Sequence, residues 1–292
     1  MQIAKKRRPV EVVLGFFLLC HPLPVLFHIV AVTVFALVAT WPHSSWNVIG
    51  LIVAAHAAMQ LSIAVLNDYC DRQADAASKK DKPIPRGLVR PGEALLAGIL
   101  LIAAMILLLL PLNPWALLIS LLYLVLGQSY NFGLKSTPLS GIVFALAIPL
   151  IPVYAFVGAG RIIPVIFWLV PVAALLGIAL NLANSLPDIE DDTANTARTL
   201  AVVLGVKRSS IVCSICILLS IILVAVLTLT HVVPVRGVFM GSTLFLSILI
   251  VIALLFFFGP EPPVPMRKLY FYLVVLLCLI LGGGWVLAAA IA

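Results

Sequence analysis

The chain has 292 residues, of which 63% are hydrophobic and only 10% are charged, and its mean hydropathy is +1.22. A soluble domain of this length does not need so much apolar surface, so the composition excludes an ordinary water-soluble enzyme and indicates an integral membrane protein. We attribute the formal net charge of +7 to membrane topology, and we expect no nucleic-acid partner.

Apolar segments of roughly the ~20 residues that cross a hydrocarbon core recur along the chain. They predict an all-α fold, a polytopic helical bundle of about nine transmembrane helices in the lipid bilayer. The predicted spans are residues 14–40, 46–66, 93–111, 115–130, 138–158, 163–184, 209–230, 238–258 and 268–291. Pro22 and Pro24 interrupt the first segment, so we expect a membrane-entry piece there, followed by the true span.

The basic residues indicate an orientation, because Lys and Arg in short loops are retained in the cytoplasm. Sixteen of the 18 Lys and Arg residues fall on the side of the N-terminus, including Lys5 and Lys6, and only Arg161 and Arg236 fall on the other side. We therefore expect the N-terminus and the loops after even-numbered spans in the cytoplasm, with the C-terminus on the opposite side.

Eight of the eleven acidic residues form two clusters, one after the second span and one after the sixth. Carboxylates at the edge of the hydrocarbon are costly, and a cluster of them usually marks a site. The first cluster is Asp68, Asp71, Asp75 and Asp81; the second is Asp188, Glu190, Asp191 and Asp192. Both follow even-numbered spans, so the topology places them on the same side of the membrane.

The two clusters share a spacing. If the second helix continues through the first cluster, steps of four and seven residues put Asn67, Asp68, Asp71 and Asp75 on one face. Aligned on this pattern, the second cluster repeats Asn, Asp and Asp at Asn184, Asp188 and Asp192. Mg²⁺ prefers oxygen ligands and is usually held by one or two carboxylates plus substrate phosphates, so the two faces suit a Mg²⁺-bound diphosphate.

Basic side chains lie near both clusters, where a diphosphate needs positive charge. They are Arg72, Lys82, Lys135 and Arg198. Tyr130 lies just before Lys135 at the inner end of the fourth span, and we expect it to reach the same space.

These segments resemble the signatures of the UbiA superfamily of intramembrane prenyltransferases, and the resemblance spans most of the chain. The residues that carry it are Asn67-Asp68-x-x-Asp71-x-x-x-Asp75, Lys82-Pro83-Ile84-Pro85, Asp188-x-x-x-Asp192 and Arg198-Thr199-Leu200-Ala201. The resemblance implies one transmembrane domain over 1–292, with two Asp-motif halves at about 10–135 and 136–292. It also implies a central cavity that cytoplasmic loops cap.

Family members bind a prenyl diphosphate through Mg²⁺ and transfer the prenyl group to a lipophilic acceptor, often an aromatic ring, in quinone, chlorophyll-type or related lipid biosynthesis. On this resemblance, the expected metal ligands are Asn67, Asp68, Asp71, Asp75, Asp188 and Asp192. The expected catalytic carboxylates are Asp68, Asp71, Asp188 and Asp192. The expected substrate-binding residues are Asn67, Arg72, Lys82, Tyr130, Lys135, Asn184 and Arg198.

The chain departs from the family pattern at several positions. Ser185 stands where many members have Asp, Thr193 and Thr196 replace the usual Arg and Gly, and His21-Pro22 stands where Arg-Pro is frequent. Two alternatives stay open: a transferase of the same superfamily that moves a sugar phosphate onto a polyprenyl phosphate, and a divalent-cation transporter. The position of both clusters at the inner interface beside Lys and Arg favours an anionic ligand over a transported cation.

Overall fold

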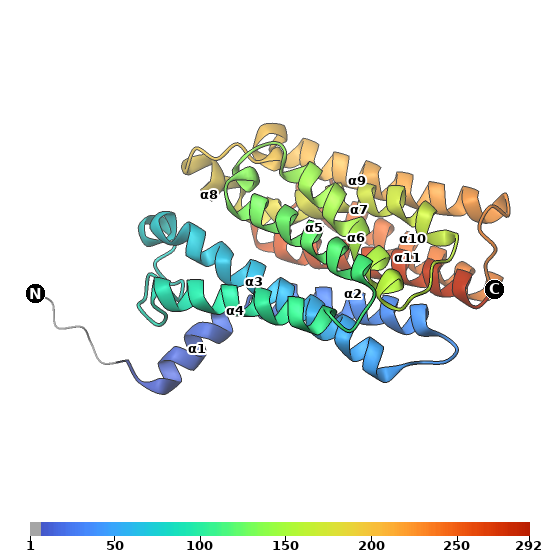
Figure 1. Cartoon of the computed structure of the whole chain (residues 1–292). Helices are drawn as coiled ribbons and strands as arrows, with labels where there is room; N and C mark the ends of the chain where they lie inside the picture. The colour runs from blue at the N-terminus through green and yellow to red at the C-terminus, as the bar shows by residue number, and fades with distance from the viewer. Residues whose placement is uncertain (1–6) are drawn as a thin grey trace, which may run out of the picture.

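A computed structural model describes residues 7–292 as helices and connecting loops without a strand, which confirms the all-α prediction. In Figure 1 the long helices run side by side along one direction, and α1 and the C-terminus lie toward opposite ends of the molecule. Lys5 and Lys6, which count toward the predicted inner charge, lie outside the described residues.

The α-helices follow in chain order: α1 (Pro9–Leu19), α2 (Pro22–Thr40), α3 (Trp46–Ser78), α4 (Pro91–Leu109), α5 (Pro114–Asn131), α6 (Ser140–Gly158), α7 (Val165–Ser185), α8 (Ile189–Ala194), α9 (Leu200–Leu229), α10 (Gly237–Ala253) and α11 (Arg267–Ala290). Short turns of other helix types occur between them: η1 (Leu134–Ser136), η2 (Leu186–Asp188), η3 (Leu254–Phe258) and η4 (Val264–Met266).

The first predicted span is divided, as Pro22 and Pro24 indicated. α1 ends at Leu19, and α2 begins at Pro22 with a proline in its first turn, where the missing N–H costs nothing. His21 between them has a left-handed backbone conformation, φ 44°. In Figure 1, α1 leaves the bundle at an angle while α2 runs along it.

Eight helices of the described chain have the length and hydropathy to cross a bilayer. They correspond to eight of the nine predicted spans, with α2 as the first. The remaining predicted span, 115–130, is α5, which has 18 residues and packs against α6, α3 and α4. α5 is outside the group of eight, and its last turn contains the polar residues Gln128, Ser129 and Asn131, of which Asn131 lines a cavity described below.

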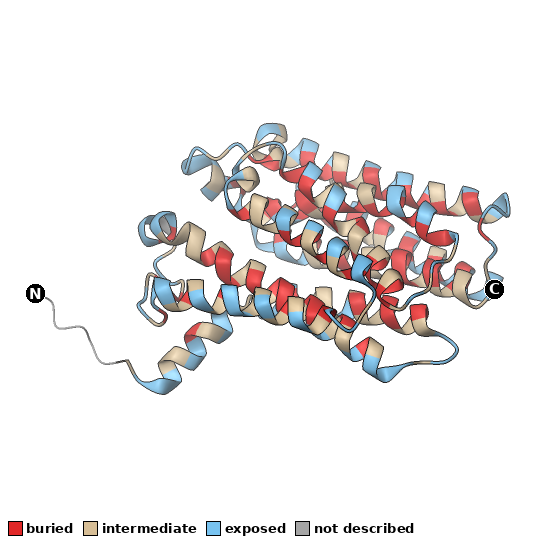
Figure 2. Ribbon diagram, viewed as in Figure 1, coloured by how far each residue is buried: buried red, intermediate tan, exposed pale blue. Residues whose placement is uncertain are grey.

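One apolar core joins the two halves of the chain. Its buried members run from Val32 on α2 to Ala288 on α11, and Figure 2 shows buried segments along the inner faces of the helices. α6 and α7 approach so closely at Gly177 that a Cβ there would lie 2.5 Å from Phe144 O. Such a small residue lets helix backbones meet in a membrane protein.

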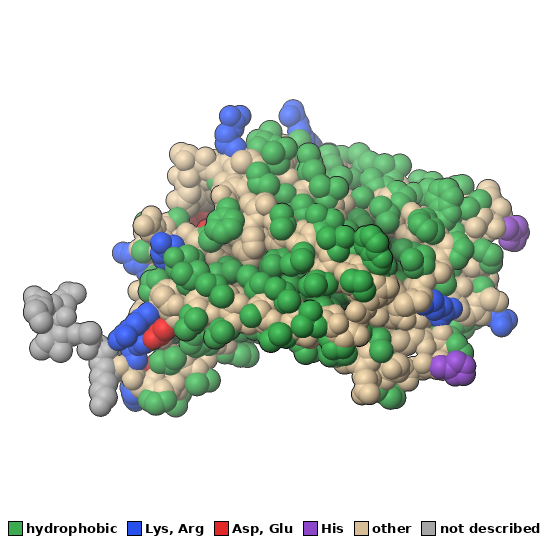
Figure 3. Space-filling model, in the orientation of Figure 1, with side chains coloured by type: hydrophobic (Ala, Val, Ile, Leu, Met, Phe, Trp, Pro, Cys, Tyr) green, Lys and Arg blue, Asp and Glu red, His purple; other side chains and the backbone are tan. Residues whose placement is uncertain are grey.

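The outer surface of the bundle is apolar. Exposed hydrophobic side chains occur on every long helix, and Figure 3 shows them spread over the middle of the visible face, with charged side chains mostly at and near the left end. A soluble monomer rarely exposes so large an apolar surface. The chain is therefore an integral, multi-pass membrane protein.

Candidate active site

The first motif lies on the last three turns of α3, which continues unbroken through it to Ser78. Asp68 and Asp75 are buried, while Asp71 and Asn67 are half-buried. The predicted face of Asn67, Asp68, Asp71 and Asp75 is thus present, because the helix does not end at the polar residues.

Asn67 is held in one orientation by Asn131 at the end of α5. Asn131 donates its amide N–H to Ile63 O at 2.9 Å, so its Oδ1 accepts from Asn67 Nδ2, also at 2.9 Å. This leaves the Asn67 oxygen, the only atom of that side chain that can bind a cation, pointing away from Asn131. Asn67 lines a cavity, described below.

Lys82 bridges two carboxylates of the first motif. Its Nζ lies 2.9 Å from Asp68 Oδ1 and 2.9 Å from Asp75 Oδ2. Burial disfavours the charge on Lys82, but the attraction of Asp68 and Asp75 outweighs it, so the pKa of Lys82 lies above its usual value. The segment that starts with Lys82 therefore folds back onto the motif that precedes it.

Lys135, in η1 after α5, makes a short ion pair with Asp71. The same loop is tied to the second motif, because the Arg198 backbone N–H donates to Ser136 O at 3.0 Å. The loop between α5 and α6 therefore lies between the two acidic segments.

The second motif has a different backbone from the first. α7 ends at Ser185, and the 3-10 turn Leu186–Asp188 follows before α8 begins at Ile189. Pro187 explains the break, because proline has no N–H to continue the helix. Asp188 is thus the last residue of the 3-10 turn and Asp192 lies on α8, so the helical path continues through the second motif with a local change of helix type.

Two contacts bring the motifs together at one end of the bundle. Lys79, which follows α3, lies 3.4 Å from Asp188 Oδ1. Lys135 pairs with Asp71 and also acts electrostatically on Asp192. Tyr130 on α5 lies within range of electrostatic interaction with Asp71, Asp188 and Asp192. The two acidic clusters therefore converge at one end of the bundle, as predicted.

Arg267 supports the second motif, although sequence reasoning gave it no role beyond topology. Its buried guanidinium donates from Nη1 to both carboxylate oxygens of Glu190 at 2.7 Å and to Leu186 O at 3.1 Å. Nε donates to Pro262 O at 3.1 Å. A buried guanidinium with charge-assisted hydrogen bonds to a side chain and to two backbone carbonyls holds these segments together. In the sequence, Glu190 lies within the second cluster and Arg267 at the start of the last span.

His21 also joins the site. Its Nε2 lies 3.1 Å from Asp68 Oδ1, on the same oxygen that Lys82 contacts. The signal was its place in His21-Pro22, where Arg-Pro is frequent in the family. An imidazole therefore contacts Asp68 from the position where the family frequently has Arg.

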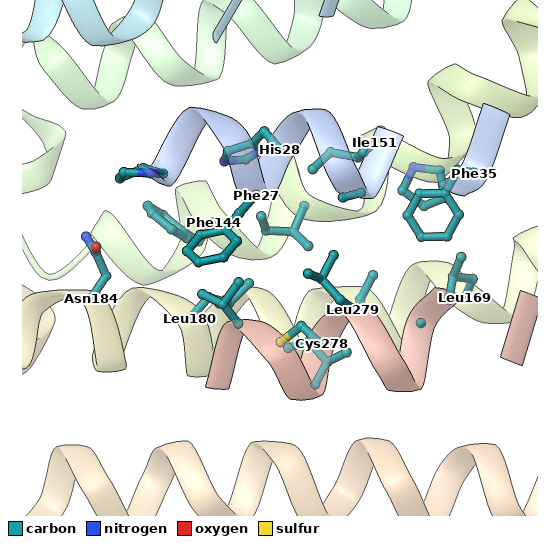
Figure 4. A pocket seen from close by; sticks show the side chains of 18 of the residues that line it. Phe27, His28, Phe35, Phe144, Ile151, Leu169, Leu180, Asn184, Cys278 and Leu279 are labelled. Carbon is teal, nitrogen blue, oxygen red and sulfur yellow. The ribbon is translucent and has the colours of Figure 1, made fainter. Parts of the chain in front are cut away.

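Three predicted residues are placed less directly. Arg72 bends back toward its own helix, donating to Tyr69 O at 2.6 Å, with its guanidinium carbon 4.3 Å from the Tyr69 ring centre. Arg198 is exposed. Asn184, in the last turn of α7, lines a cavity and is labelled in Figure 4.

Two adjoining cavities extend from this end into the bundle. The first, about 270 Å³, is lined almost entirely by apolar side chains of α2, α6, α7 and α11 and reaches Asn184. In Figure 4, Asn184 lies at one end of the labelled side chains and Phe35 and Leu169 at the other. The second, about 230 Å³, lies among α2, α3, α5 and α6 and reaches Asn67 and His21.

The donor set suits Mg²⁺ only in the presence of a further ligand. Within residues 7–292, no three His, Cys, Asp or Glu side chains lie close enough to hold a metal ion by themselves. The side chains that converge are carboxylates and an amide oxygen, the hard ligands that Mg²⁺ prefers. They fit an ion that takes its other ligands from water and from phosphate oxygens.

The sequence model of the UbiA prenyltransferase family matches residues 25–276, most of the chain. The chain belongs to the UbiA prenyltransferase family. The match includes both acidic motifs, Lys82 and Lys135, whereas His21 lies just before it.

Two of the similar proteins indicate the range of the family. The digeranylgeranylglyceryl phosphate synthase of Thermococcus kodakarensis is 29% identical over 192 residues, which are 60% of this chain and 69% of that protein. The 4-hydroxybenzoate octaprenyltransferase of Neisseria meningitidis is 33% identical over 154 residues, 50% of this chain and 51% of that protein. The chain matches little more than half the length of most of the curated relatives.

Solved structures share the fold. A UbiA homologue from Archaeoglobus fulgidus, bound to DMAPP and Mg²⁺, superposes with a TM-score of 0.74 at 19% identity, over 94% of this chain and 99% of that one. A structure of digeranylgeranylglyceryl phosphate synthase superposes with a TM-score of 0.73 at 17% identity, over 97% of this chain and the whole of the other.

Proposed function

We propose that this protein is a Mg²⁺-dependent intramembrane prenyltransferase, which transfers a prenyl group from a prenyl diphosphate to a lipophilic acceptor. The observation that carries the proposal is the convergence of the two acidic motifs around Lys79 and Lys135. Family membership and the structure of a homologue bound to DMAPP and Mg²⁺ support it.

In this proposal the carboxylates bind the metal and the lysines bind the anion. Asp68, Asp71, Asp75, Asp188 and Asp192, with Asn67, would hold Mg²⁺, directly or through water. Bound Mg²⁺ neutralises the charge that develops on a diphosphate leaving group. The ion pairs between lysines and these carboxylates must break when Mg²⁺ binds. Each lysine could then turn from an Asp oxygen to a phosphate oxygen.

The basic residues have graded roles. Lys82 and Lys135 lie among the carboxylates and would contact the diphosphate directly. Arg72 and Arg198, together with the uncharged Asn184, lie at the edge of the site. Each must reorient its side chain to reach the diphosphate. Tyr130, in ring contact with Phe144 at 5.5 Å, would line the reacting end.

The apolar cavity is suited to the prenyl chain. Its lining is apolar apart from His28 and Asn184, so it offers a hydrocarbon chain apolar contact, and Asn184 marks the end where a diphosphate would lie. Burying such a chain is favoured by roughly 0.8 kcal/mol for each CH₂ removed from water.

We further propose that residues 1–292 act as one domain whose site faces the cytoplasm, with the N-terminus on that side and the C-terminus opposite. The shared core and the uneven distribution of Lys and Arg support this. In a variant without the five native cysteines, single cysteines placed at Lys80 and His231 test the orientation. An impermeant thiol reagent added to intact cells should label only position 231; labelling of position 80 alone would contradict it.

The experiment on function uses purified protein in detergent with Mg²⁺, a radiolabelled prenyl diphosphate and extracted membrane lipids as acceptors. Asp71→Asn and Asp188→Asn keep the side-chain volume and remove the charge, so we expect prenylated product to fall at least 100-fold. Asp81→Asn, at an exposed carboxylate outside the site, is the matched control and should keep full turnover. Unchanged turnover in D71N and D188N would refute the proposal.

A further inference from the structure

A cluster of polar side chains lies inside the bundle, below the carboxylates. Gln60 Nε2 lies 3.2 Å from His28 Nδ1, 3.3 Å from His56 Nε2 and 2.9 Å from the Tyr123 hydroxyl. Gln60, His56 and Tyr123 are buried. Polar groups within a membrane span are costly and usually serve a function.

The cluster repeats the face of the active site at a greater depth. Three pairs of residues are each seven positions apart: His21, just before α2, with His28 on α2; Asn67 with Gln60 on α3; and Tyr130 with Tyr123 on α5. Seven residues are close to two full turns and advance a helix by about 10 Å. The cluster therefore lies on the same helix faces as His21, Asn67 and Tyr130, about 10 Å further into the bundle.

The contact with Gln60 bears on which atom of His28 carries the proton. Gln60 Nε2 only donates, and it has two hydrogens for three acceptors; in the arrangement in which one of them goes to His28 Nδ1, the neutral ring is protonated at Nε2. The described residues supply no hydrogen-bond partner to Nε2, although His28 lines both cavities. Figure 4 shows its ring on α2 beside Phe27. His28 thus presents a free N–H donor where the two cavities meet.

His56 supplies a second unpaired donor in the same cluster. Gln60 has two amide hydrogens and three acceptors within 3.3 Å, and when it donates to His56 Nε2 the His56 proton is on Nδ1. That Nδ1 is buried without a partner. His56 lines neither cavity, so this unpaired group is a free-energy cost of the buried cluster, and His28 is the imidazole of the cluster that a ligand can reach.

The second cavity has the character of a site for an uncharged polar molecule. None of the described residues that line it is a Lys, Arg, Asp or Glu, yet His28, Gln60, Tyr123 and Asn131 all face it. A hydrocarbon chain would leave these groups unpaired, and no Lys or Arg among the described lining residues would balance a buried anion. The apolar first cavity satisfies the prenyl chain, so the polar second cavity is left for the other substrate.

We propose that the second cavity is the acceptor subsite, and that it selects an uncharged, oxygen-bearing lipophile whose oxygen accepts a hydrogen bond from His28 Nε2–H. The inference rests on the proposed prenyltransferase function. His28 is a positioning and specificity residue here: it holds the acceptor beside the prenyl chain, and Gln60 keeps the imidazole in the tautomer that donates.

Three probes of similar size test the proposal: 1-naphthol, naphthalene without the oxygen, and 1-naphthoate with a negative charge. Binding of each is measured with Mg²⁺ and a non-hydrolysable prenyl diphosphate analogue present, in wild type, His28→Leu, His28→Gln and His43→Leu. His28→Gln retains an N–H donor near the position of Nε2, and His43→Leu makes the same change at an exposed histidine in the loop between α2 and α3.

We expect His28→Leu to weaken 1-naphthol binding roughly two- to tenfold, the size of one lost hydrogen bond, with naphthalene binding unchanged. His28→Gln should restore most of the loss, His43→Leu should match wild type, and 1-naphthoate should bind wild type more weakly than 1-naphthol. Equal effects of His28→Leu on 1-naphthol and naphthalene, or tighter binding of 1-naphthoate, would overturn the acceptor subsite.

Binding of the diphosphate analogue itself separates this inference from the proposed function. If wild type fails to bind the analogue in the presence of Mg²⁺, the prenyltransferase proposal fails, and the acceptor subsite fails with it. If the analogue binds equally well to wild type and His28→Leu while 1-naphthol shows no dependence on His28, only the acceptor subsite is wrong.

Discussion

Arg267 Nη1 lies 2.7 Å from both carboxylate oxygens of Glu190, and this contact joins the start of α11 to the second acidic motif. The same nitrogen donates to Leu186 O in the turn that precedes Asp188. One guanidinium therefore contacts the backbone before Asp188 and a side chain after it, although α8, α9 and α10 lie between Asp188 and Arg267 in the chain. The position of Asp188 depends on the last helix of the bundle.

Removal of this guanidinium should disorder the second motif without removing a carboxylate. We expect Arg267→Ala to lower prenyl transfer roughly 10- to 100-fold, because small displacements of binding groups are costly in catalysis. The Mg²⁺ concentration for half-maximal turnover should rise as well, which a general loss of fold would not produce. Turnover titrated with Mg²⁺ in detergent measures both.

The neighbouring Lys268 is exposed and provides the control, so Lys268→Ala should match wild type in both readings. Glu190→Ala tests the partner. If Arg267 acts through Glu190, the double variant should lose little more than Arg267→Ala alone; full additivity of the two losses would show that the residues act separately.

Lys82 predicts a pH dependence of stability. Its pKa in the folded protein is raised above the unfolded value of about 10.4, because Asp68 and Asp75 outweigh the effect of burial. A raised pKa means that the stabilisation is complete below the unfolded pKa and is lost only as the pH rises through the higher, folded pKa. Between pH 7 and 10 the contribution should therefore be constant.

The measurement is the difference in thermal unfolding temperature between wild type and Lys82→Met across pH 7 to 10. We expect Lys82→Met to be less stable by the same amount at each pH, because two buried carboxylates lose their cation. Lys80→Met, at an exposed lysine, should show no difference from wild type. If the difference in unfolding temperature between wild type and Lys82→Met disappeared between pH 7 and 9, Lys82 would lose its proton at too low a pH for its pKa to be raised.

His21 combines a left-handed backbone with a contact to Asp68, and two substitutions separate these effects. Glycine adopts φ 44° without strain, whereas alanine is disfavoured there by about 1 kcal/mol. Both remove the imidazole. We expect His21→Ala to unfold at a lower temperature than His21→Gly, while the two bind a prenyl diphosphate analogue with the same reduced affinity.

Equal stability of the two His21 variants would indicate that the left-handed conformation carries no cost. His21→Arg offers a further comparison, since an Arg at this position is frequent in the family. It should bind the analogue more tightly than either small variant, because a guanidinium can donate to Asp68 from the same place.

The close approach of α6 and α7 at Gly177 predicts a packing effect. A Cβ there would lie 2.5 Å from Phe144 O on the backbone of α6, so Gly177→Ala must push the helices apart. We expect a loss of stability of about 1–3 kcal/mol and weaker prenyl diphosphate binding, since Phe144 lines both cavities. Gly50→Ala on α3, where a Cβ meets nothing within 4 Å, should be neutral or stabilising.

The architecture was readable from the sequence because a bilayer imposes simple rules. Each span must be long and apolar, so the segments from Pro22–Thr40 to Arg267–Ala290 were recognised by length and hydropathy. The first motif was equally predictable, since Asn67 to Asp75 follow the helical period and α3 simply continues through them. Local chemistry also anticipated the break at Pro22.

The partners of these carboxylates were decided only by the tertiary structure. Lys82 on Asp68 and Asp75, Lys135 on Asp71 and Arg267 on Glu190 join segments that loops and whole helices separate. The choice of partner depends on where each loop lies over the bundle, and no local period encodes that placement. The division of the interior into an apolar and a polar cavity arises in the same way, because His28, Gln60 and Tyr123 meet only when α2, α3 and α5 pack.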